Sequence, residues 1–217
     1  MSSKFGSLIL LSAIATAASA APYSFVTWDK NTQTANTIHG TIPTDLGLIG
    51  VDLTGNFTDV YTNYPSWSPA STFSGGVVGN APDTNMLVRV DVAGSYTVAF
   101  SQPVSNVAMS LWSVGQGGNV IGYNFDHNVQ LVSGGPSAEY NGQSLVQTGP
   151  QSVTGEEGNG TLAIGGTMSG YGFNIVGNEG YHGFTIGLQH AQAVPEPTSM
   201  AALALGGVAL LRRRKRA

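Results

Sequence analysis

Two adjacent glutamates, Glu156 and Glu157, lie in a glycine-flanked segment, with Gly155 before them and Gly158 after them. Adjacent side chains on a strand face opposite sides, so the pair does not predict the two facing carboxylates of a glycoside hydrolase. On a tight loop both could reach one cation, and calcium prefers several oxygen ligands. If the chain holds a metal ion, we expect calcium at Glu156, Glu157 and Asp126; the alternative is that these acids only solvate turns. Further loop residues with suitable oxygens are Asn128, Asn159 and Glu179.

Aromatic side chains offer a second kind of chemistry, the stacking of sugar rings. Trp112 alternates with Met109 and Leu111, so it faces solvent if those two are in the core. Trp67 lies in the proline-rich segment 64–69, which is also expected to be accessible. Trp67 and Trp112 are therefore the candidate glycan-stacking residues. The alternative is that the tryptophans cover the edges of the core, as aromatic residues in sandwiches usually do.

Established catalytic motifs are missing from the sequence. It contains no nucleophile elbow, no zinc-protease helix motif and no glycine-rich phosphate loop. The four histidines are dispersed, whereas zinc sites usually have two ligands close in sequence. We therefore predict no catalytic residues and no cofactor other than the calcium considered above, and a protein that is not an enzyme. A polysaccharide-active enzyme on a jelly-roll scaffold is the weakest alternative, because no paired carboxylates stand out.

The charge of the chain is distributed unevenly. Of its 8 lysine and arginine residues, only Lys30 and Arg89 lie between Ala21 and Ala193, where eleven of the 12 acidic residues also lie. That stretch has a net charge of −9 and lacks the clustered basic face that nucleic-acid binding requires, so no nucleic-acid partner is expected. The chain contains no cysteine, which excludes disulfides and thiol chemistry.

Alternation of apolar and polar residues predicts strands along the whole stretch from residue 21 to residue 190. We expect about eleven strands, over residues 23–28, 48–53, 57–61, 86–92, 96–101, 107–112, 120–125, 129–133, 161–164, 171–175 and 184–188. Gln102-Pro103 is expected to end a strand. Long loops are expected at 30–42 and 63–83. The spacing predicts an all-β fold, an antiparallel, jelly-roll-like β-sandwich in one domain, 21–190.

The first twenty residues are typical of a secretory signal peptide. Lys4 is followed by a mostly apolar stretch and then by Ala18-Ser19-Ala20. We expect an N-terminal signal helix over 1–20 that signal peptidase cleaves between Ala20 and Ala21. The alternatives are an uncleaved membrane anchor and an ordinary buried helix.

The tail, 191–217, has three consecutive parts: Val194-Pro195-Glu196-Pro197, an apolar stretch at 198–211, and a basic cluster. The two prolines exclude a helix interior and predict an extended segment. Fourteen residues make a short transmembrane helix of about 21 Å, against a bilayer core of about 30 Å. The basic cluster is expected to remain cytoplasmic. Its residues are Arg212, Arg213, Arg214, Lys215 and Arg216.

These three parts, in this order at the C-terminus, resemble the PEP-CTERM sorting signal of Gram-negative bacteria. The resemblance implies recognition of Pro195, Glu196 and Pro197 by an exosortase, a membrane enzyme that processes the tail. It also implies transient anchoring in the inner membrane with the body in the periplasm, followed by transfer to the cell surface or extracellular matrix. The alternative is a simple C-terminal anchor. Residues 96–188 are more loosely similar to bodies that accompany such tails, in 98–106, 157–161 and 183–188, which implies a β-sandwich and no particular activity.

Together these observations predict a non-enzymatic exported protein with a structural or adhesive role in exopolysaccharide or biofilm. Its expected partners are signal peptidase, the exosortase and exopolysaccharide. The alternative is a carbohydrate-binding module, assisted by calcium.

Overall fold

The structure is a computed structural model, and it describes residues 20–190 except 46, 65 and 66. The predicted signal helix at 1–20 therefore lies, but for Ala20, outside the described residues, and so does the predicted tail at 191–217 with its membrane helix. Within the part of the chain that is described, no helix is long and apolar enough to cross a membrane.

The described residues form thirteen strands joined by antiparallel ladders, with one turn of α-helix and one of 3₁₀-helix. This confirms the predicted all-β antiparallel fold. The strands are β1 (Tyr23–Phe25), β2 (Thr27–Asp29), β3 (Thr37–Thr44), β4 (Gly47–Thr54), β5 (Asp59–Tyr61), β6 (Leu87–Val90), β7 (Gly94–Val114), β8 (Ile121–Phe125), β9 (Val129–Pro136), β10 (Val146–Gly149), β11 (Ser152–Gly155), β12 (Gly158–Val176) and β13 (His182–Gln189); the helices are α1 (Ala70–Phe73) and η1 (Lys30–Thr32).

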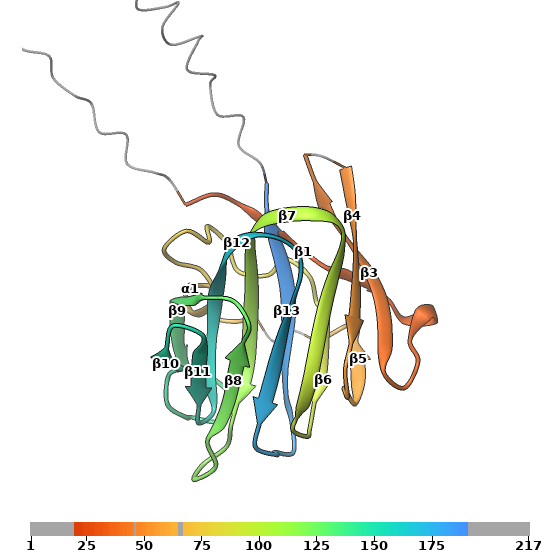
Figure 1. Ribbon diagram of the computed structural model, residues 1–217. Helices are drawn as coiled ribbons and strands as arrows, with labels where there is room; N and C mark the ends of the chain where they lie inside the picture. Colours follow the sequence, from red (N-terminus) through yellow and green to blue (C-terminus); the bar gives the residue numbers. More distant parts are fainter. Residues whose placement is uncertain (1–19, 46, 65–66, 191–217) are drawn as a thin grey trace, which may run out of the picture.

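Two long strands, β7 and β12, divide the fold into two layers. The first half of β7 pairs with β4 and with the second half of β12, and β8, β11 and β10 extend this first layer. The second half of β7 pairs with β13 and with the first half of β12, and β9 and β6 extend this second layer. Figure 1 shows β7 and β12 arching from one layer to the other at the same end of the molecule.

The prediction that Gln102-Pro103 ends a strand is wrong, because β7 continues through both residues. The proline is tolerated because it lies in the arch, where the register between β7 and β12 is interrupted. In the facing strand, a Cβ at Gly170 would lie 2.4 Å from the carbonyl oxygen of Val98, so only glycine permits the approach. The expected loop at 30–42 is also wrong in part, because β3 begins at Thr37.

Apolar side chains fill the space between the two layers. Tyr96 and Phe173, from the first layer, stack with ring centroids 5.1 Å apart, and Phe173 meets Phe184 of the second layer edge to face at 5.4 Å. In the first half of β7, buried residues that face this core alternate with exposed ones, which is the pattern that the sequence predicts for a sandwich.

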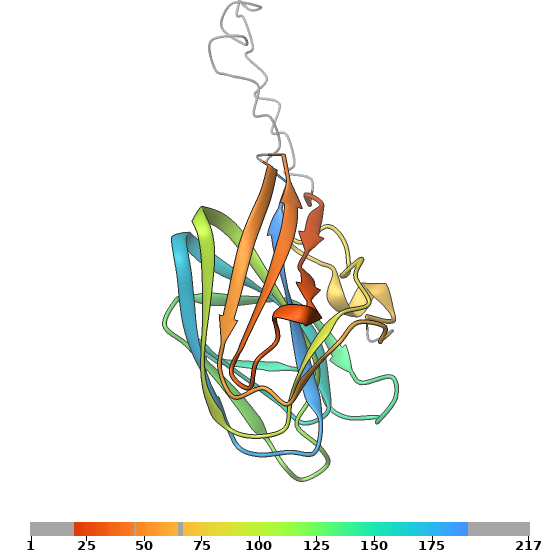
Figure 2. The same ribbon diagram turned by 90° about the vertical axis from the view of Figure 1, so that its right-hand side faces the viewer.

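A long connection between β5 and β6, which contains α1, covers the outer face of the second layer. The hydroxyl of Thr161 on β12 donates to the backbone carbonyl of Phe73 at the end of α1, at 2.9 Å. Trp67, Phe73 and Leu87 form an apolar cluster there with Trp112 of β7. Figure 2 shows this connection outside the sheet, and β13 and the second half of β7 are accordingly buried on both of their faces.

Candidate functional site

Both ends of the described chain meet on neighbouring strands. β1 pairs with β13 in antiparallel register, Tyr23 opposite Gln189, and the amide of His190 donates to the carbonyl of Pro22 at 3.0 Å. Ala21 is buried and is bridged to Val78. The predicted signal cleavage position, between Ala20 and Ala21, and the strand that leads into the tail therefore lie at the same end of the sandwich, beside the arches (Figure 1).

A cavity of about 230 Å³ opens at this end, between the arch of β7 and the end of β13. Ile49, Pro103, Val104 and Leu188 supply its apolar walls. The predicted sorting residues Val194, Pro195, Glu196 and Pro197 and the basic cluster at 212–216 lie outside the described residues.

The three acids expected to share a calcium ion do not lie together. The ladder between β8 and β11 pairs Ile121 with Gly155 and Asn124 with Ser152, so Glu156 follows one end of the ladder and Asp126 the other. Five residues of strand separate these ends by about 17 Å. Within the described ranges, no group of three histidine, aspartate or glutamate side chains could hold a metal ion. The expectation of one site shared by Asp126, Glu156 and Glu157 is therefore wrong.

Each of these acids instead accepts hydrogen bonds from neighbouring protein groups. Asp126 accepts from the amide of Gly172 at 2.8 Å, and Glu156 accepts from the amide of Gly118 at 2.7 Å. Glu157 accepts from the hydroxyl of Ser113 at 2.7 Å. Two amides and one hydroxyl hold the three carboxylates in place, which is a structural use of these charges.

The two candidate sugar-stacking tryptophans are buried. Trp112 is 1% exposed and Trp67 is 8% exposed, so the expectation that they are accessible is wrong. Alternation placed Trp112 correctly on the face opposite Leu111. That face is covered by the connection between β5 and β6, which local periodicity does not predict.

Trp112 is instead the floor of a cluster of tyrosines. Its ring meets those of Tyr64, Tyr181 and Tyr140 edge to face, at centroid distances of 5.2, 5.0 and 6.0 Å. Tyr61 stacks on Tyr64 at 5.8 Å. Tyr61, Tyr64 and Tyr181 are half-buried and Tyr140 is 52% exposed. We call Tyr61, Tyr64, Tyr140 and Tyr181 the tyrosine cluster; sequence reasoning missed it because its members come from three distant segments.

An arginine anchors one side of the tyrosine cluster. Arg89 donates to both carboxylate oxygens of Asp91, at 2.7 and 2.8 Å, and to the hydroxyl of Tyr61 at 2.9 Å. Its guanidinium carbon lies 4.9 Å from the centre of the Tyr181 ring. The bond to Asp91 raises the pKa of Arg89, so this pair is a neutral, fixed unit at the edge of the cluster.

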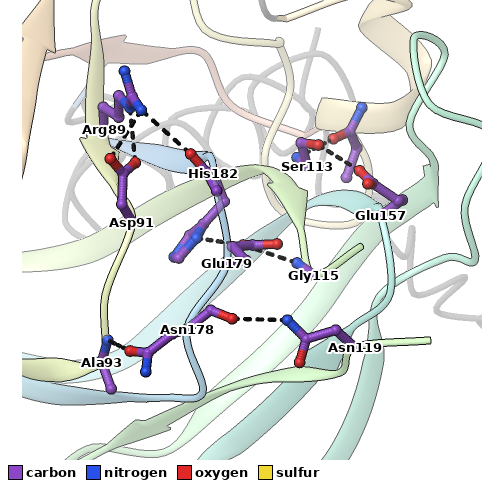
Figure 3. A network of polar contacts seen from close by, with 12 residues as sticks. Arg89, Asp91, Ala93, Ser113, Gly115, Asn119, Glu157, Asn178, Glu179 and His182 are labelled. Carbon is purple, nitrogen blue, oxygen red and sulfur yellow. Dashed lines mark hydrogen bonds and ion pairs between the residues drawn. The ribbon is translucent and has the colours of Figure 1, made fainter. Parts of the chain in front are cut away.

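Beneath the cluster, a β-bulge fixes the direction of Trp112. Gly158 pairs with Val114 and Gly160 with Leu111, so Asn159 faces two residues, Trp112 and Ser113. The buried side chain of Asn159 accepts from the amide of Ser113 at 2.6 Å. Ser113 has φ 51° and Glu157 has φ 62°, both left-handed, and their side chains bond to each other (Figure 3).

A buried acid–imidazole contact lies next to the bulge. Glu179 Oε1 contacts His182 Nδ1 and also accepts from the amide of Gly115 at 3.0 Å (Figure 3). Both side chains are almost completely buried, at 1% and 0% exposed. Burial raises the pKa of the nearby Glu157. The negative charge of Glu179 raises it further, whereas the hydrogen bond from Ser113 lowers it. The network holds the turns at this end of the sandwich together and has no opening to solvent at His182.

Comparison with known proteins identifies one feature of the chain. A family model for the PEP-CTERM protein-sorting motif matches residues 193–216. No curated protein and no solved structure matches the chain.

Proposed function

We propose that this chain, whose PEP-CTERM motif makes it an exported protein with a C-terminal sorting signal for an exosortase, is a non-enzymatic component of the cell surface or extracellular matrix. Its body would have a structural or adhesive role in exopolysaccharide. The observation that carries the proposal is the motif at 193–216, which begins four residues after the end of β13.

The position of the body relative to the motif supports this proposal. From His190, the last described residue, five residues of chain lead to Pro195 and span at most about 18 Å, so the arch end of the sandwich is within that reach of the segment that an exosortase would recognise. The N-terminal strand β1 lies at the same end. Signal peptidase and the exosortase would thus act at one end of the body, leaving the opposite end free for a partner.

The acids of the body support a role without catalysis. Asp126 and Glu156 accept hydrogen bonds from backbone amides, and Glu157 bonds to Ser113 in the bulge. Each of these carboxylates holds a turn or the bulge in place, which supports a structural use of it. We therefore propose that the protein acts by binding and assembly.

The experiment that tests the proposal replaces one residue of the motif. Glu196→Ala should leave the tail attached, so the protein should remain in the membrane fraction at its unprocessed mass. Thr198→Ala, two residues further on, is the matched control and should be processed as the wild type is. Membrane, cell-surface and matrix fractions would be separated and the mass of the protein measured in each.

Two results would contradict the proposal. Normal processing of Glu196→Ala would show that Glu196 is not needed for recognition of the motif. If the wild-type protein is processed but is absent from both the surface and the matrix fractions, the proposed location is wrong.

A further inference from the structure

We infer that the tyrosine cluster is a binding surface for an uncharged polysaccharide. This inference rests on the proposed function and deepens it, because it names the surface by which the exported body would hold exopolysaccharide. It is carried by the contacts of Tyr61, Tyr64, Tyr140 and Tyr181 with one another and with Trp112.

The rings of the cluster are suited to sugar. The faces of aromatic rings are electron-rich, so they attract the weakly positive C–H groups on the face of a hexose. Tyr140 is 52% exposed, and Tyr64 and Tyr181, which contact the same Trp112, are half-buried. The ring centroids of Tyr61, Tyr64 and Tyr181 lie 5.8 to 6.0 Å apart, so these three rings form one continuous aromatic group.

Rigid support distinguishes this cluster from ordinary surface tyrosines. Trp112 lies below three of the rings, and the bulge at Asn159 and Ser113 fixes its position. Arg89 holds the hydroxyl of Tyr61 from the side. A surface that is ordered before binding loses little conformational entropy when a flexible polymer attaches to it.

Charge selects the class of polysaccharide. Arg89 is neutralised by Asp91, and Glu139 is exposed next to Tyr140. Glu139 also lies near enough to Tyr64 to contribute to the raised pKa of that tyrosine, of which burial is the main cause. With two bases against eleven acids in residues 21–193, the body repels polyanions, and the basic group at the cluster, Arg89, is already paired with Asp91; we therefore take an uncharged chain as the ligand.

The place of the cluster in the fold agrees with this role. Tyr181 immediately precedes His182, the first residue of β13, whereas the tail follows the last, Gln189. Eight residues of strand are about 26 Å long. The cluster is therefore displaced toward the end of the sandwich opposite the tail.

The test uses the exported protein, purified from the producing strain, in native gels that contain hydroxyethyl cellulose, laminarin or galactomannan. At least one of these uncharged polymers should retard the wild type, and alginate, a polyanion, should not. Tyr140→Ala should weaken the retardation about three- to tenfold, the contribution of one exposed aromatic contact. Tyr140→Trp should retain it, because the larger ring preserves the stacking face.

Leu48→Ala is the matched control, because Leu48 is 72% exposed in the hairpin of β3 and β4 at the arch end. It should bind as the wild type does. Absence of retardation by all three uncharged polymers, equal binding by Tyr140→Ala and wild type, or binding of alginate alone would overturn the inference. Failure of the proposed function can be distinguished from failure of this inference. The first would change the location of the protein in cell fractions, and the second would change the binding of the purified protein to polysaccharide.

Discussion

The buried Asn159 side chain should carry much of the stability of the β-bulge under Trp112. Asn159→Ala removes the acceptor that lies 2.6 Å from the amide of Ser113, and both residues are about 1% exposed. A buried donor left without a partner costs about 1–3 kcal/mol. For a domain of this size 1 kcal/mol lowers the Tm by about 2–4 °C, so a loss of about 2 kcal/mol lowers it by about 4–8 °C.

Asn174→Ala, on the same strand, is the matched control. Asn174 accepts from the hydroxyl of Ser95 at 2.6 Å, but the contact is exposed. Water can replace the lost partner, so the free energy of unfolding should change by no more than about 0.5 kcal/mol.

Thermal unfolding followed by circular dichroism measures both variants, and amide hydrogen exchange reports on Ser113 directly. The exchange of that amide should accelerate in Asn159→Ala and remain slow in Asn174→Ala. Equal Tm values for the two variants, or an unchanged exchange rate at Ser113, would refute the assignment of Asn159 as the acceptor that holds the bulge.

Two further predictions concern metal and pH. Adding calcium, or removing it with a chelator, should leave the Tm of the protein unchanged, because Asp126 is separated from Glu156 and Glu157 by the length of β8; a Tm that rises with calcium would show another site. Burial, with a smaller contribution from Asp91, raises the pKa of Tyr96 to about 12. The neutral phenol is thus favoured in the folded state, so its contribution is complete below pH 10 and is lost as the pH rises through 12. Tyr96→Phe should make alkaline unfolding less steep, and an identical alkaline transition in a pH titration of the Tm would contradict this.

Much of the fold could be predicted from local patterns. Alternation along 107–112 and 171–175 identified strands, because the two faces of each strand meet different environments. The same reasoning divided β7 and β12 into four strands. In an arch the chain keeps its extended strand geometry while it passes from one layer to the other. No local sequence pattern distinguishes such an arch from the end of a strand at Pro103.

The candidate site was less accessible to sequence reasoning. Trp112 was placed on the correct face of its strand but predicted to be exposed, because the segment that covers it is separated by some forty residues of chain and contains Trp67 and Phe73. The acids Glu156 and Asp126 looked like neighbours because both lie in turns, yet the β8–β11 register places them at opposite ends of a ladder. Contacts of this kind depend on which strands pair.

The sorting signal of the protein could be identified from its sequence without a structure. A sorting motif is a contiguous segment that another protein reads, so Val194 to Pro197, the apolar stretch and the basic cluster carry their meaning without a tertiary fold. The tyrosine cluster depends wholly on that fold. Tyr61, Tyr64 and Tyr181 meet because β13 pairs with both β6 and β7, and Tyr140 joins them because β12 pairs with both β7 and β9, which precedes it. Local periodicity fixes the face on which a side chain lies, and only the packing of layers decides what covers that face.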